Sequence, residues 1–222
     1  MLWDLDGTLI DTEPYWFASE VALVTSYGGT WTYEDNLRLV GSPLLDAAAD
    51  IRARTPVSAE PVAVVEALQD GVMRRLRERI PWRPGVLDLL DELAAAGVPT
   101  AMVTMSWRPM VQIVLDALPD DRFDAVVTGE MVTVGKPDPE AYLLALDLLG
   151  IPPTLAGSCV AIEDSPMGSG ASVAAGIPTL VTPAAATVEP GPGLAILTDL
   201  AGVRASDLLA LAPAPSAPGG RR

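Results

Sequence analysis

Two acidic residues, Asp4 and Asp6, stand two positions apart near the start of the sequence, and Gly7 follows them. At the end of a strand, residues two apart project to the same side, about 6–7 Å from each other at the backbone. Gly7 allows the chain to turn away sharply after the pair. Such carboxylates can supply a nucleophile with a general acid or base, or they can hold a metal. An acidic turn after a strand would explain the pair equally well.

A hydroxyl group follows the apolar segment Pro99–Val103, where Thr104 is succeeded by Met105 and Ser106. A hydroxyl and free backbone N–H groups at the start of a helix can bind a phosphate oxygen. The alternative is that Ser106 only caps the following helix, which is a common role of serine.

Lys136 is the only lysine in the sequence and lies between Gly135 and Pro137. A composition that otherwise uses arginine for its basic residues suggests that this position requires lysine. An ordinary loop lysine is the alternative. A phosphate-binding loop of the Walker A type does not fit, because Gly129 is one residue too far upstream and Pro137 replaces the required hydroxyl.

A second acidic pair, Glu163 and Asp164, precedes Ser165 at the end of another apolar segment. Adjacent carboxylates at the carboxyl end of a strand are typical ligands of hard cations. A helix cap explains them as well. In the helix expected after this pair, Gly168 and Gly170 are unusual because glycine destabilises a helix interior.

The elements that must position these residues are short apolar strands alternating with amphipathic helices. This pattern predicts an α/β fold with a Rossmann-like parallel sheet and helices on both faces. The carboxyl ends of its strands would bring all four candidate positions to one crevice. The expected strands are Met1–Leu5, Pro99–Val103, Phe123–Thr128, Ser158–Ile162 and Ile177–Val181. The helices expected with them are Pro84–Ala96, Ser106–Leu118, Pro139–Leu149 and Ser165–Ala175.

Residues 13–80 carry helical spacing only, with helices expected over Glu13–Tyr27, Thr32–Val40, Pro43–Arg54 and Glu60–Arg79. We therefore expect a Rossmann-like core of residues 1–12 and 81–211, into which residues 13–80 are inserted as a helical cap. The segment 212–222 is rich in Pro, Ala and Gly and is expected to be disordered.

Composition restricts the chemistry further. The 222 residues contain no histidine and one cysteine, Cys159, which exclude histidine-based triads and an internal disulfide. The formal net charge of −15 opposes binding to nucleic acid or anionic lipid. We see neither a signal peptide nor an apolar run of the ~20 residues that span a bilayer. A cytoplasmic protein without nucleic-acid or membrane partners is expected.

The four motifs together resemble those of the haloacid dehalogenase-like superfamily. Asp4–Thr8 (DLDGT) resembles its first motif and Thr104 its second, while Lys136 in GKPDPE and Glu163 in EDSPMG resemble its third and fourth. The order and spacing agree, and the match extends over nearly the whole chain. The helical insertion resembles the helical cap of members such as phosphoglycolate phosphatase and β-phosphoglucomutase.

The resemblance implies a function for each motif. Asp4 would attack phosphorus and become an aspartyl-phosphate, and Asp6 would act as general acid and then general base. Thr104 and Lys136 would bind the phosphoryl oxygens, completing a catalytic set with the two aspartates. The implied Mg²⁺ ligands are Asp4, Asp6 (through its backbone carbonyl), Glu163 and Asp164. The expected substrate-binding residues are Ser42, Thr104, Met105, Ser106 and Lys136.

The family's sub-classes differ at a few positions. Dehalogenases lack the second aspartate, so Asp6 indicates phosphoryl transfer. β-Phosphoglucomutases resembling this chain carry a histidine where Trp16 stands and an arginine just after the cap glycine, where Ser42 stands. Arg38 or Arg52 could replace that arginine. Only three residues precede Asp4, so a short central strand is expected.

We therefore expect an Mg²⁺-dependent phosphatase that hydrolyses a small phosphate monoester, such as a sugar phosphate, as a monomer or homodimer. Trp16, Trp31 and Ser42 are the expected cap contacts. Two alternatives stay open, namely a phosphomutase of the β-phosphoglucomutase type and a catalytically weak protein that binds phosphorylated metabolites.

Overall fold

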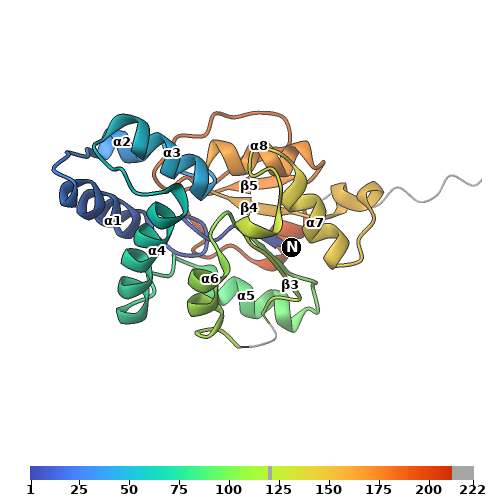
Figure 1. Ribbon diagram of the computed structural model, residues 1–222. Coiled ribbons are helices and arrows are strands. Elements are labelled where there is room, and N and C mark those ends of the chain that lie inside the picture. The colour runs from blue at the N-terminus through green and yellow to red at the C-terminus, as the bar shows by residue number, and fades with distance from the viewer. Residues whose placement is uncertain (120–121, 212–222) are drawn as a thin grey trace, which may run out of the picture.

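A six-stranded parallel sheet forms the centre of the computed structural model, which describes residues 1–119 and 122–211 (Figure 1). The strand order is β3-β2-β1-β4-β5-β6, so β1 lies between β2 and β4. All five neighbouring pairs are parallel, as the alternation of strands and helices predicts. The strands are β1 (Leu2–Trp3), β2 (Ala101–Val103), β3 (Ala125–Val127), β4 (Ala161–Glu163), β5 (Thr179–Val181) and β6 (Leu194–Ile196).

Successive strand residues point to opposite faces of the sheet and enter two different apolar clusters. Trp3, Met102 and Ile162 belong to the cluster that includes α5 (Val86–Ala95), α6 (Arg108–Leu115) and α9 (Ala205–Leu209). Their neighbours Leu2, Ala101 and Ala161 belong to the cluster with α7 (Glu140–Leu148) and α8 (Pro166–Ala174). The expected helices on both faces of the sheet are therefore confirmed. The predicted short central strand is confirmed too, and it is paired on both sides.

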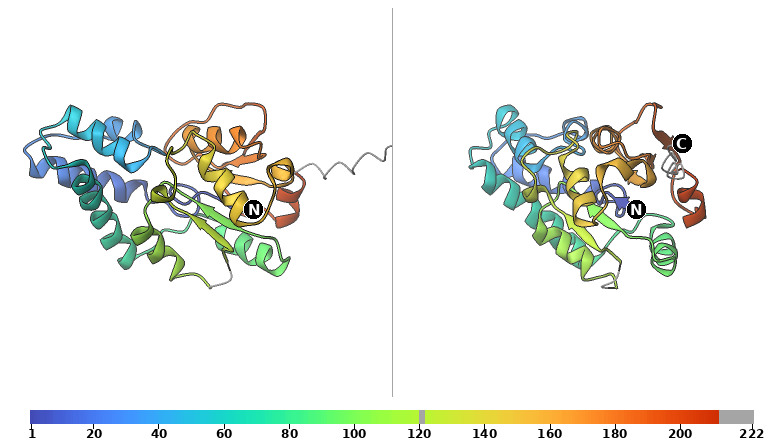
Figure 2. Two further views of the ribbon diagram at one scale, coloured as in Figure 1. Left: turned by 45° about the vertical axis from the view of Figure 1, so that its right-hand side comes forward. Right: turned by 90° about the vertical axis from the view of Figure 1, so that its right-hand side faces the viewer.

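The segment that reads as helical in the sequence forms α1 (Glu13–Ser26), α2 (Tyr33–Leu37), α3 (Leu44–Arg54) and α4 (Pro61–Glu78). These helices gather at one end of the sheet, as Figure 1 and the left view of Figure 2 show. They enclose a third apolar cluster, which includes Trp31, Ile51 and Leu68. The division into a core of residues 1–12 and 81–211 and a cap of residues 13–80 stays a prediction.

Helix α4 contributes to two of the three clusters. Val64, Val65 and Leu68 pack with α1 and α3, whereas Val72 and Leu76 pack with the sheet cluster on the α5–α6 side. A single continuous helix thus connects the inserted helices to the apolar core beneath the sheet.

The sequence pattern did not reveal β6, α9 or the two short 3₁₀ helices, Gly129–Met131 and Pro153–Ser158. The predicted disordered segment 212–222 lies outside the described residues. In the part of the chain that the structure covers, no helix is long and apolar enough to cross a membrane.

Candidate active site

The four sequence motifs meet at the carboxyl edge of the sheet. Asp4 and Thr104 directly follow the adjacent strands β1 and β2, and Asp164 directly follows β4. The backbone N–H of Asp4 donates to the Ile162 carbonyl (3.0 Å), which extends the β1–β4 ladder to this residue. The crevice therefore opens where β1 separates β2 from β4, the position where such sheets bind ligands.

Lys136 connects the first and fourth motifs. Its Nζ donates to Asp4 Oδ1 (2.8 Å), to Glu163 Oε1 (2.6 Å) and to the Val103 carbonyl (3.0 Å). The lysine side chain is only 2% exposed. These contacts favour a fixed cation over the ordinary loop lysine that the sequence alone allowed.

Glu163 lies behind Lys136 rather than beside the open pocket. Its Oε1 also accepts a hydrogen bond from the Tyr142 hydroxyl, and its Oε2 accepts from the Asp164 N–H at 3.3 Å. The Tyr142 ring centre lies 5.2 Å from the lysine Nζ. This arrangement fixes the direction in which the ammonium group points.

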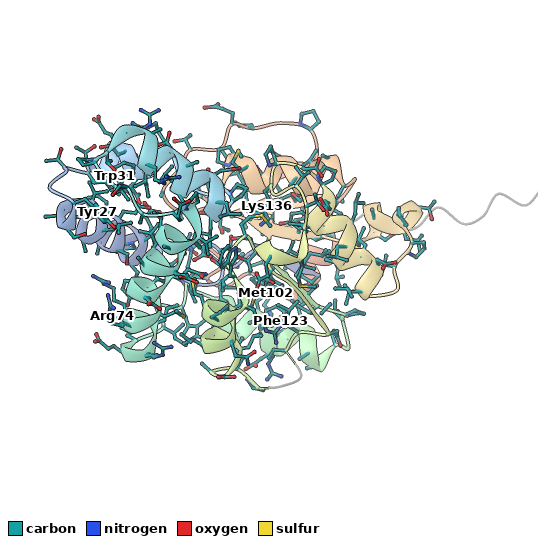
Figure 3. All side chains as sticks on the ribbon, in the orientation of Figure 1. Tyr27, Trp31, Arg74, Met102, Phe123 and Lys136 are labelled. Atoms are coloured by element: carbon teal, nitrogen blue, oxygen red, sulfur yellow. The ribbon has the colours of Figure 1, made fainter. Side chains whose placement is uncertain are left out.

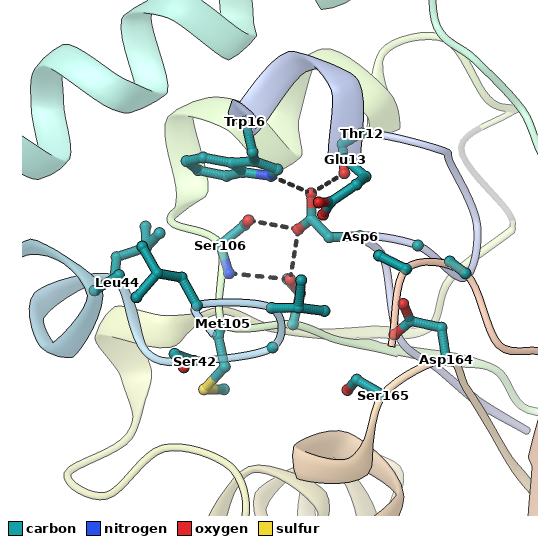
Figure 4. A pocket seen from close by; sticks show the side chains of 18 of the residues that line it. Asp6, Thr12, Glu13, Trp16, Ser42, Leu44, Met105, Ser106, Asp164 and Ser165 are labelled. Atoms are coloured by element: carbon teal, nitrogen blue, oxygen red, sulfur yellow. Dashed lines mark hydrogen bonds between the residues drawn. The ribbon is translucent and has the colours of Figure 1, made fainter. Parts of the chain in front are cut away.

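Four donors hold the Asp6 carboxylate (Figure 4). Ser106 Oγ donates to its Oδ2 (2.6 Å), while Thr12 Oγ and Trp16 Nε1 donate to its Oδ1 at 2.6 and 3.0 Å. The hydroxyl of Thr104 accepts from the Ser106 N–H (3.0 Å) and lies 3.5 Å from Asp6 Oδ2. Ser106 thus orients Asp6. It does not cap α6, whose N-cap residue is Trp107.

Asp4, Glu163 and Asp164 form a cluster of buried carboxylates. One oxygen of each lies within 4.8 Å of the others, and Asp4 Oδ2 is buried without a hydrogen-bond partner. A divalent cation would satisfy that oxygen, because Mg²⁺ prefers carboxylate ligands. Asp4 and Asp164 are the better placed ligands, since Glu163 is already engaged with Lys136 and Tyr142.

Gly7 is required by this geometry. Its φ of +84° is a left-handed conformation that glycine adopts without strain. A Cβ at this position would lie 2.0 Å from Asp164 Oδ2. The glycine after the first motif therefore leaves room for the carboxylate of the fourth.

Burial dominates the electrostatics of the cluster. It raises the pKa of Asp4 to about 7, an effect that Lys136 opposes and Glu163 reinforces. Burial, with Asp4 and Glu163, raises the pKa of Asp164 well above its ordinary value. Burial alone would lower the pKa of Lys136, but Asp4 and Glu163 outweigh it and raise it. The carboxylates thus need positive charge nearby to stay ionised.

The pocket above these groups is closed by residues of the inserted helices. Its wall includes Trp16, Ser42, Met105 and Ser106, whose contact with substrate stays a prediction. Trp31 does not line it but lies among the inserted helices, away from Lys136 (Figure 3). The lining residues contributed by the inserted helices and their connections are Glu13, Trp16, Glu20, Asn36, Leu39, Val40, Gly41, Ser42, Leu44, Ala47 and Leu68.

Three site residues escaped the sequence analysis, namely Thr12, Glu13 and Glu20. Glu13, Trp16 and Glu20 follow one another at three- and four-residue spacing, which places them on one face of α1. This face of α1 is otherwise expected to be apolar. The two carboxylates on it are the sequence signal that could have identified it as part of the pocket.

Comparisons with known proteins agree with this geometry. The family model of haloacid dehalogenase-like hydrolases matches residues 1–176. The chain is 32% identical to hexitol phosphatase B of Escherichia coli K12, covering 82% of each chain. It is 30% identical to the phosphorylated carbohydrates phosphatase of Thermotoga maritima, covering 80% of this chain and 81% of that protein.

Solved structures show the same architecture. The crystal structure of CbbY from Rhodobacter sphaeroides in complex with phosphate superposes with a TM-score of 0.84 at 28% identity, covering 93% of this chain and 97% of that one. The family model spans all four motifs, and the structure joins them in one crevice. The chain therefore belongs to the haloacid dehalogenase-like hydrolase family.

Proposed function

We propose that this protein is an Mg²⁺-dependent phosphatase that hydrolyses small sugar or sugar-alcohol monophosphates through an aspartyl-phosphate on Asp4. The observation that carries the proposal is the state of the Asp4 carboxylate. Lys136 holds one of its oxygens, while the other is buried, unpartnered and close to Asp164. A nucleophile restrained by a cation on one side and a metal ligand set on the other suits attack on an anionic phosphate.

The bound Mg²⁺ would offset the repulsion between carboxylate and phosphate and neutralise charge on the transferred group. Lys136 holds Asp4 in position for attack and supplies positive charge to the phosphoryl oxygens. Thr104, whose hydroxyl accepts from the Ser106 N–H, would bind the same group. Asp6 gives a proton to the leaving oxygen, and later removes one from the water that hydrolyses the intermediate.

Asp6 is placed to change between two positions. In this structure Ser106, Thr12 and Trp16 hold its carboxylate. Because both oxygens accept hydrogen bonds here, Asp6 would take up a proton from water, rotate toward the leaving oxygen and donate that proton to it. These hydrogen bonds would thus hold the Asp6 side chain at the pocket wall until a substrate is bound.

The sugar specificity rests on relatives that match over four fifths of their length, among them hexitol phosphatase B and the phosphorylated carbohydrates phosphatase. The phosphomutase alternative is disfavoured by charge. A mutase must bind a second phosphate group and needs a cationic side chain for it, yet neither Arg38 nor Arg52 lines the pocket. Arg38 is instead paired with Asp35 on the surface.

The direct test is release of inorganic phosphate from 4-nitrophenyl phosphate and from a panel of sugar phosphates, with Mg²⁺ and with chelator. We expect turnover only with the metal, and we expect Asp4→Asn to reduce it to background. Asp6→Asn should lower kcat by about 10²–10⁴-fold.

Three results would contradict the proposal. Activity that survives both chelation and Asp4→Asn would contradict the aspartyl-phosphate mechanism. Isomerisation of a sugar phosphate that depends on a bisphosphate, with little phosphate released, would indicate the mutase. Binding of phosphorylated sugars without turnover across the panel would indicate a binding protein.

A further inference from the structure

One face of α1 carries three polar side chains into the pocket, and two of them already have a function there. Trp16 donates to Asp6. Glu13 accepts a hydrogen bond from the Asn36 side-chain amide of α2, which connects the two helices. Glu20, two turns along α1 from Glu13, lines the same pocket and takes no part in the proposed chemistry.

Glu20 is an unusual residue for this place, because it is only 4% exposed and its surroundings are mainly apolar. Its Oε2 accepts a hydrogen bond of 2.8 Å from the Trp31 indole N–H, and both residues are buried. No described residue donates to its other oxygen, Oε1. Oε1 keeps some accessible surface in this mostly buried residue, so a donor in the pocket can reach it.

Trp31 fixes the direction of the carboxylate. The indole packs in the apolar cluster of the inserted helices, so its N–H has a defined position. Leu44, Ala47 and Leu68 form the apolar wall beside Glu20. Glu20 is therefore an oriented hydrogen-bond acceptor at the end of the pocket formed by the inserted helices, away from the strand ends that hold Asp4.

The charges of the pocket restrict what can lie against Glu20. Among the lining residues of the described chain, Lys136 is the single basic side chain, and it is committed to Asp4 and Glu163. Glu20 makes this end of the pocket acidic, whereas Glu13 lies beside Asp6 (Figure 4). A second phosphate group placed there would meet a carboxylate and no cation, whereas a hydroxyl group would find an acceptor.

Burial also raises the pKa of Glu20 to about 7, partly opposed by the hydrogen bond from Trp31 and reinforced by Glu13.

We propose that Glu20, oriented by Trp31, is a specificity-determining residue that accepts a hydrogen bond from a hydroxyl group of the substrate, and that it selects polyhydroxylated monophosphates over bisphosphates. This inference rests on the proposed function and concerns the part of the substrate that does not react. Glu20 acts on substrate choice and leaves the phosphoryl chemistry to the strand-end residues.

The test compares kcat/KM for glucitol 6-phosphate with that for 4-nitrophenyl phosphate, which has no hydroxyl group to reach Glu20. Glu20→Leu should lower kcat/KM for glucitol 6-phosphate by about 10–100-fold, the loss expected when a hydrogen bond to a charged group is removed. The value for the aryl phosphate should change by less than about twofold. Glu66→Gln, at an exposed position of α4, is the control.

Two further variants keep the test valid if leucine disturbs folding. In Glu20→Gln, the amide oxygen must accept from Trp31, which leaves an NH₂ donor where the substrate needs an acceptor. Trp31→Phe removes the donor and keeps most of the ring. Both should raise KM for glucitol 6-phosphate with little change in kcat or in the aryl phosphate reaction. Wild-type enzyme should not prefer glucose 1,6-bisphosphate to glucose 6-phosphate.

Equal losses on both substrates would show that Glu20 is structural and overturn the inference. Unchanged kinetics of folded Glu20 variants, or a preference for the bisphosphate, would do the same while leaving the phosphatase proposal intact. Failure of wild-type enzyme to hydrolyse even the aryl phosphate would overturn the proposed function itself.

Discussion

The Asp6 carboxylate is oriented in part by a tryptophan, Trp16. The Trp16 indole N–H donates to Asp6 Oδ1 at 3.0 Å and can never transfer a proton in the physiological pH range. Trp16 therefore acts only as a positioning residue. It orients the Asp6 carboxylate and cannot itself act as an acid.

Replacing Trp16 by phenylalanine removes this donor and keeps an aromatic ring in the wall. We expect kcat for 4-nitrophenyl phosphate to fall by about tenfold, the effect of one hydrogen bond to a charged group. Trp107→Phe is the matched control, since no described residue accepts from its indole. Equal effects in both variants would contradict the positioning role.

Glu20 predicts a stability that depends on pH. Its pKa is raised from 4.5 to about 7 in the folded protein. Between pH 4.5 and pH 7 the folded state binds more protons at Glu20 than the unfolded state does. The contribution of Glu20 to the free energy of unfolding is therefore fully present below pH 4.5 and is lost as the pH rises through 7. Glu20→Gln abolishes that loss. The variant should gain about 2–3 kcal/mol relative to wild type between pH 5 and pH 8.

Urea unfolding at both pH values measures this difference. The comparison with wild type cancels the titration of Asp4 and Asp164, which both proteins share. A constant difference between pH 5 and pH 8 would show that Glu20 has an ordinary pKa.

At the scale of the elements, α8 approaches β4 so closely that one glycine is indispensable. A Cβ at Gly168 would lie 2.0 Å from Glu163 Oε2, whereas a Cβ at Gly170 would meet only Pro137, at 3.5 Å. Both glycines are unfavourable for helix formation, but only one of the two positions requires glycine for steric reasons. The first makes room for the residue that holds Lys136, and the second is exposed.

Gly168→Ala should destabilise the protein by about 1–3 kcal/mol through overpacking, and it should lower activity because Glu163 must move. Gly170→Ala should be neutral or stabilise by about 0.5–1 kcal/mol through helix propensity, with activity unchanged. Thermal denaturation and kcat of the two variants provide the measurement. Similar destabilisation by both would show that helix packing, rather than Glu163, requires glycine here.

The sequence pattern predicted the elements that carry strong periodicity and the residues that directly follow strands. Asp4, Thr104 and Asp164 could be placed this way because parallel strands end at one edge. β6 and α9 were missed, since three half-exposed residues and five residues give too short a pattern. Glu20 was missed because its partner, Trp31, lies across a chain turn, and only tertiary packing brings the two together.

At the scale of the whole molecule, the net charge of −15 contrasts with a site that must attract an anion. In the proposed function, Mg²⁺ and Lys136 would supply that attraction locally. The unliganded cluster of Asp4, Glu163 and Asp164 is therefore a source of repulsion that the metal should relieve.

We expect Mg²⁺ at a hundredfold excess over its Kd to raise the Tm by about 5–10 °C. Asp164→Asn should reduce this shift strongly, although it can raise the Tm without metal because one buried charge is removed. Asp88→Asn, at an exposed acidic position of α5, should leave the shift unchanged. Scanning calorimetry with and without Mg²⁺ distinguishes these outcomes. A shift that persists in Asp164→Asn would place the metal elsewhere.

The first half of helix α4 packs in the cluster around Trp31, and its second half packs in the core below the sheet. Natural variation and protein engineering therefore meet different constraints along one helix. Changes near Leu68 can reshape the pocket and give access to new substrates. Changes near Val72 and Leu76 act on the scaffold that every substrate shares, so the boundary between adaptable and fixed sequence falls within α4.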